Sequence, residues 1–258
     1  MSSEIYKRHF YVNKDVLQIV NEEIIEYDMQ SAGLSIIKSN HLVSDRMIAL
    51  LESLPKEERN IKIGNLQKQD KDLVRSLNDG FAEYRRLFLE SNDVSEECVL
   101  SIKKDAIFTT KRCKYLEFDS VKFSDKNVYT SYYYFPGSSR IELYYNKAKL
   151  DVKGINNDNV KLHSKYMGAF FNRYAYMNEI STKSNLIKFI NEFSYLYKTR
   201  QLDKGYYREF NANSFFRLFE RVTGCDVAVG SVEDIDVNAI DITYNFFSFI
   251  VPLIERMI

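Results

Sequence analysis

The chain has 258 residues, of which 45% are hydrophobic, and its 36 Lys and Arg residues balance 36 Asp and Glu residues. This composition describes a folded protein with a substantial core and excludes a disordered chain. The net charge of zero gives no global positive field of the kind that often marks nucleic-acid-binding proteins. Because Cys98, Cys113 and Cys225 form no CxxC pair and no His clusters with them, neither a zinc site nor a disulfide framework is expected.

Neither end of the chain predicts a membrane segment. The N-terminus is charged where a signal peptide needs an apolar stretch, and no apolar run approaches roughly 18 residues. The final segment, NFFSFIVPLIERMI, is short and contains Pro252 and Glu255, so a buried terminal helix is favoured over an anchor. We therefore expect a cytoplasmic protein, in the host cytoplasm if the chain is viral, with no membrane partner.

The first predicted elements are a strand and a helix. Residues 22–28, EEIIEYD, form a short β-prone run, and the following SAGLSIIKSNHLV can begin a helix because Ser31 is an N-cap type of residue. Residues 44–92 are rich in Leu, Lys, Arg and Glu, with interruptions at Pro55, Gly64 and Gly80. This pattern predicts two or three helices in an inserted subdomain.

Strands and then more helices are expected in the rest of the chain. Four β-branched or aromatic runs predict consecutive antiparallel strands: VLSIKKDAIFTTKRC, KYLEFDSVKF, NVYTSYYYF and RIELYYN. The alternating tyrosines in these runs are expected to pack in a core more often than to stack on bases. Beyond Lys161, apolar residues three and four apart predict helices over HSKYMGAFFNRYAYMNEI, SNLIKFINEFSYLYKTR and NSFFRLFERVTG.

Two acidic residues carry the best functional clue. Asp28 ends the first predicted strand, before a turn whose amides would face a bound anion, and Asp105 lies inside a β-prone run where an unpaired carboxylate would be costly. On neighbouring strands, the two could hold two divalent ions roughly 4 Å apart, as phosphoryl transfer requires. Two simpler interpretations stay open: Asp28 could cap the following helix, and Asp105 could pair with a neighbouring lysine.

The order of several short motifs resembles that of the family B DNA polymerases. Residues 28–37, DMQSAGLSII, look like motif A, commonly DFNSLYPSII, and residues 104–108, KDAIF, resemble the end of motif C, DTDSIF. Between them, residues 78–82, NDGFA, loosely echo the NSxYG element of motif B, and residues 151–155, DVKGI, are similar to the segment that ends the palm. The sequence departs from the family at Lys103, which replaces the first Asp of motif C.

The resemblance implies a palm that binds two Mg²⁺ or Mn²⁺ ions through Asp28, Asp105 and the backbone carbonyl of Met29. It implies nucleoside triphosphates and a primer with its template as substrates, with other replication subunits as optional partners. Gly33 stands where the family usually has a Tyr that excludes a 2′-hydroxyl, so ribonucleotides would be tolerated. The residues expected to bind the nucleotide are Ser31, Ala32, Gly33, Arg59, Lys62, Arg75 and Asn78, and those expected to contact nucleic acid are Lys153 and Gly154.

The expected fold is α+β, with an antiparallel-sheet palm at residues 1–43 and 94–160. Residues 44–93 would form a fingers-like helical insertion, and residues 161–258 a helical thumb-like region. Two functions follow. The first is a template-directed polymerase or primase-like nucleotidyltransferase. The second is a catalytically inactive palm-like or unrelated α+β protein that binds nucleic acid or a replication partner, which Lys103 and the neutral charge favour.

Overall fold

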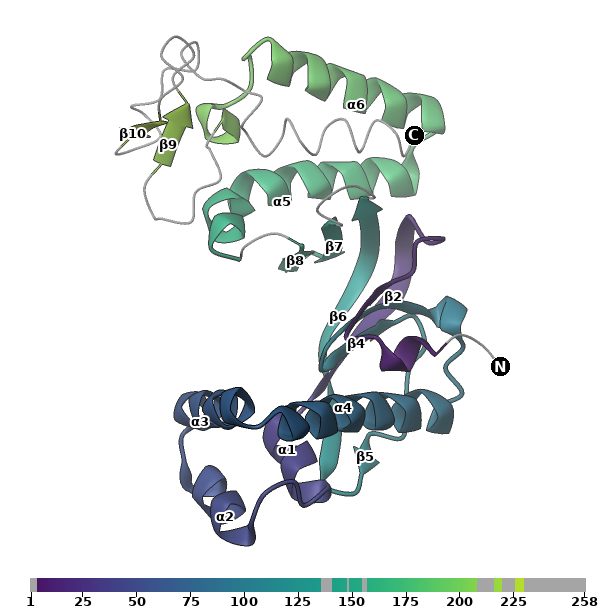
Figure 1. Cartoon of the computed structure of the whole chain (residues 1–258). Helices are drawn as coiled ribbons and strands as arrows, with labels where there is room; N and C mark the ends of the chain where they lie inside the picture. The colour runs from purple at the N-terminus through teal and green to yellow at the C-terminus, as the bar shows by residue number, and fades with distance from the viewer. Residues whose placement is uncertain are drawn as a thin grey trace. The chain divides into compact units, whose positions relative to one another are not determined.

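The computed structural model describes residues 4–135, 141–147, 149–154, 157–207, 216–219 and 226–229 (Figure 1). The chain divides into two compact units. Unit 1 comprises residues 1–15 and 23–129, and unit 2 comprises residues 16–22 and 130–258. Two long strands, β2 (Gln18–Met29) and β6 (Val121–Phe135), each run from one unit into the other.

The sheet of unit 1 follows the order β1-β3-β4-β2-β6, with β5 paired to β6. β1 pairs antiparallel with β3, β3 with β4, β4 with β2, and β5 with β6. An antiparallel sheet in a mixed α and β fold is thus confirmed. The remaining strands of this sheet are β1 (Phe10–Val12), β3 (Val99–Lys103), β4 (Ala106–Thr109) and β5 (Glu117–Phe118).

Residues 44–92 form three helices, in agreement with the two or three that the sequence predicted. They belong to unit 1, as the sheet does. The strongly amphipathic α4 buries one face along its whole length, including Phe81 and Phe88. Gly80 lets α1 approach α4, because a Cβ there would lie 2.3 Å from Cγ2 of Ile36. The helices of unit 1 are η1 (Ile5–Lys7), α1 (Ala32–Ser39), α2 (Asp45–Ser53), α3 (Lys56–Gln69), α4 (Lys71–Ser91) and η2 (Glu96–Cys98) (Figure 1).

Unit 2 has an aromatic core between its strands and helices. Tyr133 and Phe135 of β6 pack with Phe170, Phe171 and other side chains of the helices. Core packing was predicted for the alternating tyrosines of the strands. It is confirmed, because all five are buried: Tyr132, Tyr133, Tyr134, Tyr144 and Tyr145. The described elements are β7 (Ile141–Asn146), β8 (Lys149–Lys153), α5 (Asn157–Ile180), α6 (Lys183–Lys198) and η3 (Lys204–Tyr207).

The helix predicted over NSFFRLFERVTG is wrong in its described part. Phe216–Phe219 is a strand, β9, and it pairs antiparallel with β10 (Asp226–Val229). Apolar residues in so short a run fit a helix period and a strand period almost equally well, and the pairing partner decides between them. The predicted terminal helix at residues 245–258 lies outside the described residues. Within the described part of the chain, no helix is both long and apolar enough to span a membrane.

Candidate active site

Asp28 lies near the end of β2, where the chain turns into α1. β2 ends at Met29, and α1 begins at Ala32. Ser31 occupies the N-cap position but makes no side-chain cap, because it is in the left-handed region with φ of 46°. Its hydroxyl instead accepts a hydrogen bond of 3.2 Å from Nη2 of Arg59 on α3. The turn after Asp28 is therefore hydrogen-bonded through the side chain of Ser31 to α3, and through the carbonyls of Gln30 and Ser31 to Ser35 of α1.

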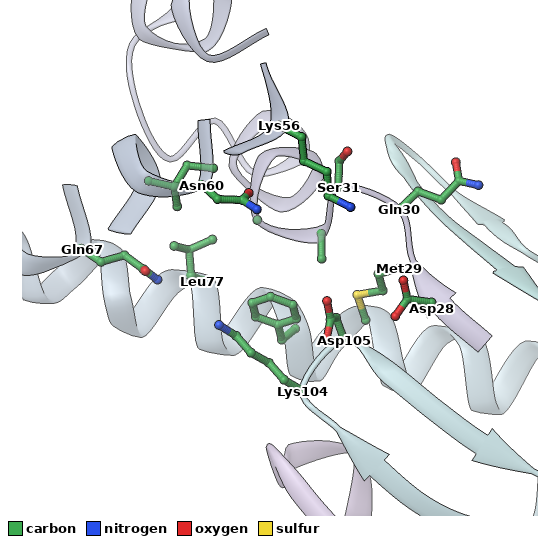
Figure 2. Close-up of a pocket in the computed structure, with 14 residues that line it drawn as sticks. Asp28, Met29, Gln30, Ser31, Lys56, Asn60, Gln67, Leu77, Lys104 and Asp105 are labelled. Atoms are coloured by element: carbon green, nitrogen blue, oxygen red, sulfur yellow. The ribbon is translucent and has the colours of Figure 1, made fainter. Parts of the chain in front are cut away.

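Asp105 lies in the tight turn between β3 and β4, not inside a strand as the sequence suggested. Residues 104 and 105 form the turn, and Lys103 and Ala106 pair across it. On the neighbouring strand, Asp28 is in register with Ala106, and the backbone N–H of Met29 donates to the carbonyl of Asp105 at 3.0 Å. The two acids, distant in sequence, are thus held side by side (Figure 2).

A lysine and a second buried carboxylate stand beside Asp28. Nζ of Lys126 lies 3.3 Å from Oδ1 of Asp28 and 3.6 Å from Oε1 of Glu26. Partial burial raises the pKa of Asp28, the positive charge of Lys126 opposes this rise, and Asp105 adds to it by repulsion. Burial contributes most to the rise in the pKa of Asp28, and the repulsion from Asp105 contributes less. A cation bound between them would relieve both the burial and the repulsion.

A buried arginine, Arg85, donates a hydrogen bond to the β3–β4 turn that carries Asp105. Arg85 of α4 is 0% exposed, and it donates from Nε to the carbonyl of Tyr6 at 2.7 Å and from Nη1 to the carbonyl of Lys104 at 2.5 Å. Burial lowers the pKa of Arg85 to about 10, and attraction to Asp105 limits the fall. Nη2 has no hydrogen-bond partner among the described residues. The guanidinium thus links the N-terminal segment to the turn that carries Asp105.

A cavity of about 560 Å³ opens over the two acids (Figure 2). Its volume is within the range of small-molecule sites, roughly 300–1,000 Å³. One side, which we call the carboxylate wall, comprises Asp28, Met29, Lys104 and Asp105 with Leu77 and Phe81 of α4. The other side, the α3 wall, comprises Lys56, Asn60, Ile63 and Gln67. Between the walls lies the turn into α1, with Gln30, Ser31, Ala32 and Gly33.

Six of the residues expected from the sequence line this one cavity: Asp28, Met29, Ser31, Ala32, Gly33 and Asp105. Arg59 reaches it indirectly through Ser31. Three others do not line it: Lys62; Arg75, which lies 3.3 Å from Asp72 on the exposed face of α4; and Asn78, which lines a separate hollow with His9. Lys153 and Gly154 belong to unit 2, and their role stays a prediction.

Five polar residues of the cavity were missing from the expected set: Lys56, Asn60, Gln67, Lys104 and Gln30. The first three share one face of α3 with Ile63, at spacings of three and four residues. That spacing could have been read from the sequence. Which face of α3 is turned toward Asp105 could not, because the polar residues of α3 surround the helix.

Gly33 faces Ile63 across the cavity. A Cβ on Gly33 would lie 3.6 Å from Cδ1 of Ile63, which is ordinary contact. Ile63 is almost fully buried. The space beside Gly33 is therefore bounded by an apolar side chain of α3.

The two carboxylates suit Mg²⁺ or Mn²⁺. Mg²⁺ is commonly held by one or two carboxylates together with substrate phosphates and water, and Asp28 and Asp105 supply two at the mouth of an open cavity. Among the described residues, no three His, Cys, Asp or Glu side chains gather as a metal-binding group.

The whole chain, residues 1–258, matches the model of a family described as Bacteriophage PBS1 gene 130 protein. The chain belongs to this family. No curated protein matches the chain. Membership places the protein among bacteriophage proteins, and the family description names no chemistry.

Proposed function

We propose that the cavity is the active centre of a nucleotidyltransferase that extends a nucleic-acid primer on a template. One observation carries the proposal: Asp28 at a strand end and Asp105 in the adjacent hairpin turn meet at one cavity large enough for a nucleotide. Polymerising palms need such an acid pair on neighbouring strands. The antiparallel sheet around it and the helices beside it are consistent with a palm and fingers, and the helices of unit 2 with a thumb.

In this proposal each wall has its own task. Asp28 and Asp105, with the carbonyl of Met29, would hold two divalent ions, Mg²⁺ or Mn²⁺. Bound ions would activate the primer 3′-hydroxyl and stabilise the pyrophosphate leaving group. Ser31, Ala32 and Gly33 would lie along the nucleotide, and Lys56 and Asn60 would face it from α3. The Lys126 side chain of the ion pair with Asp28 is 51% exposed, and because exposed ion pairs are worth about 0–1 kcal/mol, a metal ion would compete with Lys126 for Asp28.

Ribonucleotide tolerance is part of the proposal. Gly33 has no side chain to meet a 2′-hydroxyl, and Ile63 is the nearest side chain beyond it. Rates with ribonucleoside and deoxyribonucleoside triphosphates should therefore be similar. A strict preference for deoxyribonucleotides would contradict ribonucleotide tolerance, but it would not contradict the role proposed for Asp28 and Asp105.

A second candidate is a catalytically inactive protein that binds nucleic acid or a replication partner. Two observations favour it: Lys103 stands where the resemblance expects an acid, and Lys126 already pairs with Asp28. This candidate predicts no dependence on divalent metal. The bacteriophage family fits either candidate, since both would act in replication within the infected cell.

Primer extension with Mg²⁺ or Mn²⁺ separates the two candidates. Asp28→Asn and Asp105→Asn should each reduce extension more than about 100-fold, because even loss of an outer-shell partner of a metal ligand costs roughly 10–100-fold. Asp119→Asn is the matched control, since Asp119 is exposed in a turn with φ of 50°, a conformation that Asn accepts. Extension that survives either Asp28→Asn or Asp105→Asn would refute the site.

A further inference from the structure

Lys104 holds an unusual backbone conformation at the tip of the β3–β4 turn. Its φ is 55°, in the left-handed region where Gly, Asn and Asp are preferred and where another L-residue costs roughly 1–2 kcal/mol. Its N–H donates to the carbonyl of His9 at 2.7 Å, and its carbonyl accepts from Arg85. The fold therefore imposes a strained turn on a residue type that does not favour it, and such strain is often stored at functional positions.

The side chain of Lys104 is directed into the cavity rather than away from it (Figure 2). Its ammonium lies 5.3 Å from the ring centroid of Phe81 on the carboxylate wall. None of the ion pairs found among the described residues involves Lys104, although Asp105 is the next residue. The exposed ammonium of Lys104 thus lines the cavity and is accessible to a ligand.

A second lysine lines the opposite wall. Lys56 enters the cavity from the first turn of α3, while Lys104 enters from the hairpin (Figure 2). The cavity therefore presents two carboxylates together and two ammonium groups on facing walls. A ligand that interacts with all four groups must carry several negative charges. Some of these charges would bind cations held by the two carboxylates, and others would bind the lysine ammonium groups directly. Polyphosphates have this distribution, and a lysine serves them as a point charge.

We propose that Lys104 binds the phosphate chain of the incoming nucleoside triphosphate, beyond the oxygens that the metal ions hold. This inference rests on the proposed function, because it takes the occupant of the cavity to be a nucleotide. It assigns the position next to Asp105 a substrate-binding role, and it gives a reason for a lysine where the backbone would favour glycine or asparagine.

Titration of the full-length protein with GTP and with inorganic tripolyphosphate, both with Ca²⁺ in place of Mg²⁺, tests the assignment. Lys104→Gly should weaken binding of both ligands about tenfold, which corresponds to about 1.4 kcal/mol. It should not lower the unfolding temperature, since glycine relieves the left-handed strain. Lys104→Arg should stay within about threefold of wild type because it keeps the charge.

Lys103→Met is the matched control, because Lys103 is the preceding residue on the same hairpin and does not line the cavity. It should leave both affinities unchanged. Unchanged affinity in Lys104→Gly, or an equal loss in Lys103→Met, would overturn the assignment, as would wild-type protein that binds neither ligand. Failure of the proposed function has a different signature: binding that depends on Lys104 but primer extension that ignores Asp28→Asn and Asp105→Asn.

Discussion

The two walls of the cavity are built in opposite ways. The carboxylate wall stands on α4, whose buried face includes Phe81, Tyr84 and the fully buried Arg85. The α3 wall belongs to helix α3. All residues of α3 are among those the structure describes, and Ile63 is the one buried residue of this helix. Elements with few buried apolar contacts open at lower free energy than core elements. One wall is therefore fixed in geometry, and the other can adapt to a ligand.

This contrast matches the tasks that the proposal gives to each wall. Groups that hold metal ions need a geometry fixed by packing and hydrogen bonds. Groups that meet a variable nucleotide can be carried on an element that moves. Substitutions at named residues test this contrast between the two walls. The expected effects on stability decrease from Arg85 to Asp28.

The largest effect is expected at Arg85. Arg85→Met removes a fully buried guanidinium and leaves the partly buried carbonyls of Tyr6 and Lys104 without their donors, and a lost hydrogen bond to a charged group costs about 1.5–3 kcal/mol. We expect about 2–5 kcal/mol less stability in urea unfolding and roughly 10–100-fold less primer extension. Arg86→Met is the matched control, since Arg86 pairs with Glu83 at the surface and should change stability by about 0–1 kcal/mol. Equal effects at the two positions would argue against a fixed carboxylate wall.

An intermediate effect is expected at the glycines of the two helices. Gly80→Ala places a Cβ against Ile36 and should destabilise the fold by about 1–2 kcal/mol, after a gain in helix propensity. Gly64→Ala in α3 meets nothing within 4 Å, so it should stabilise by about 0.5–1 kcal/mol. Chemical denaturation measures both. Opposite signs support the contrast between the walls, and a loss of stability at both positions contradicts it.

The smallest effect concerns the ionisation of Asp28 in metal-free protein. Because burial raises its pKa above the ordinary value of 3.8, the fold favours the protonated form. Wild type should then lose stability relative to Asp28→Asn as pH rises from 3.8 through the raised pKa, and the difference should level off above it. Urea unfolding of both proteins, measured with a chelator present from about pH 3 to about pH 8, tests this prediction. Wild type that gains stability relative to Asp28→Asn over this pH range would contradict it.

Local patterns in the sequence determined much of the frame. The β-prone run before Asp28 and the helix after it form as predicted, and residues 44–92 form three helices, because short-range periodicity reports which face of an element is buried. The pairing of β2 with β4 did not follow from succession along the chain, but the antiparallel pairs β3–β4, β5–β6, β6–β7 and β7–β8 join strands that follow one another. These features depend on residues close to one another in sequence.

Only the tertiary structure decided what the cavity contains. The turn at Lys104 and Asp105 has no glycine or asparagine to announce it, and contacts from His9 and Arg85 impose it. The choice of Lys56 rather than Lys62 for the lining depends on how α3 is rotated over Gly33, where Ile63 packs. In both cases the deciding contacts join residues far apart in the chain, and no local pattern records them.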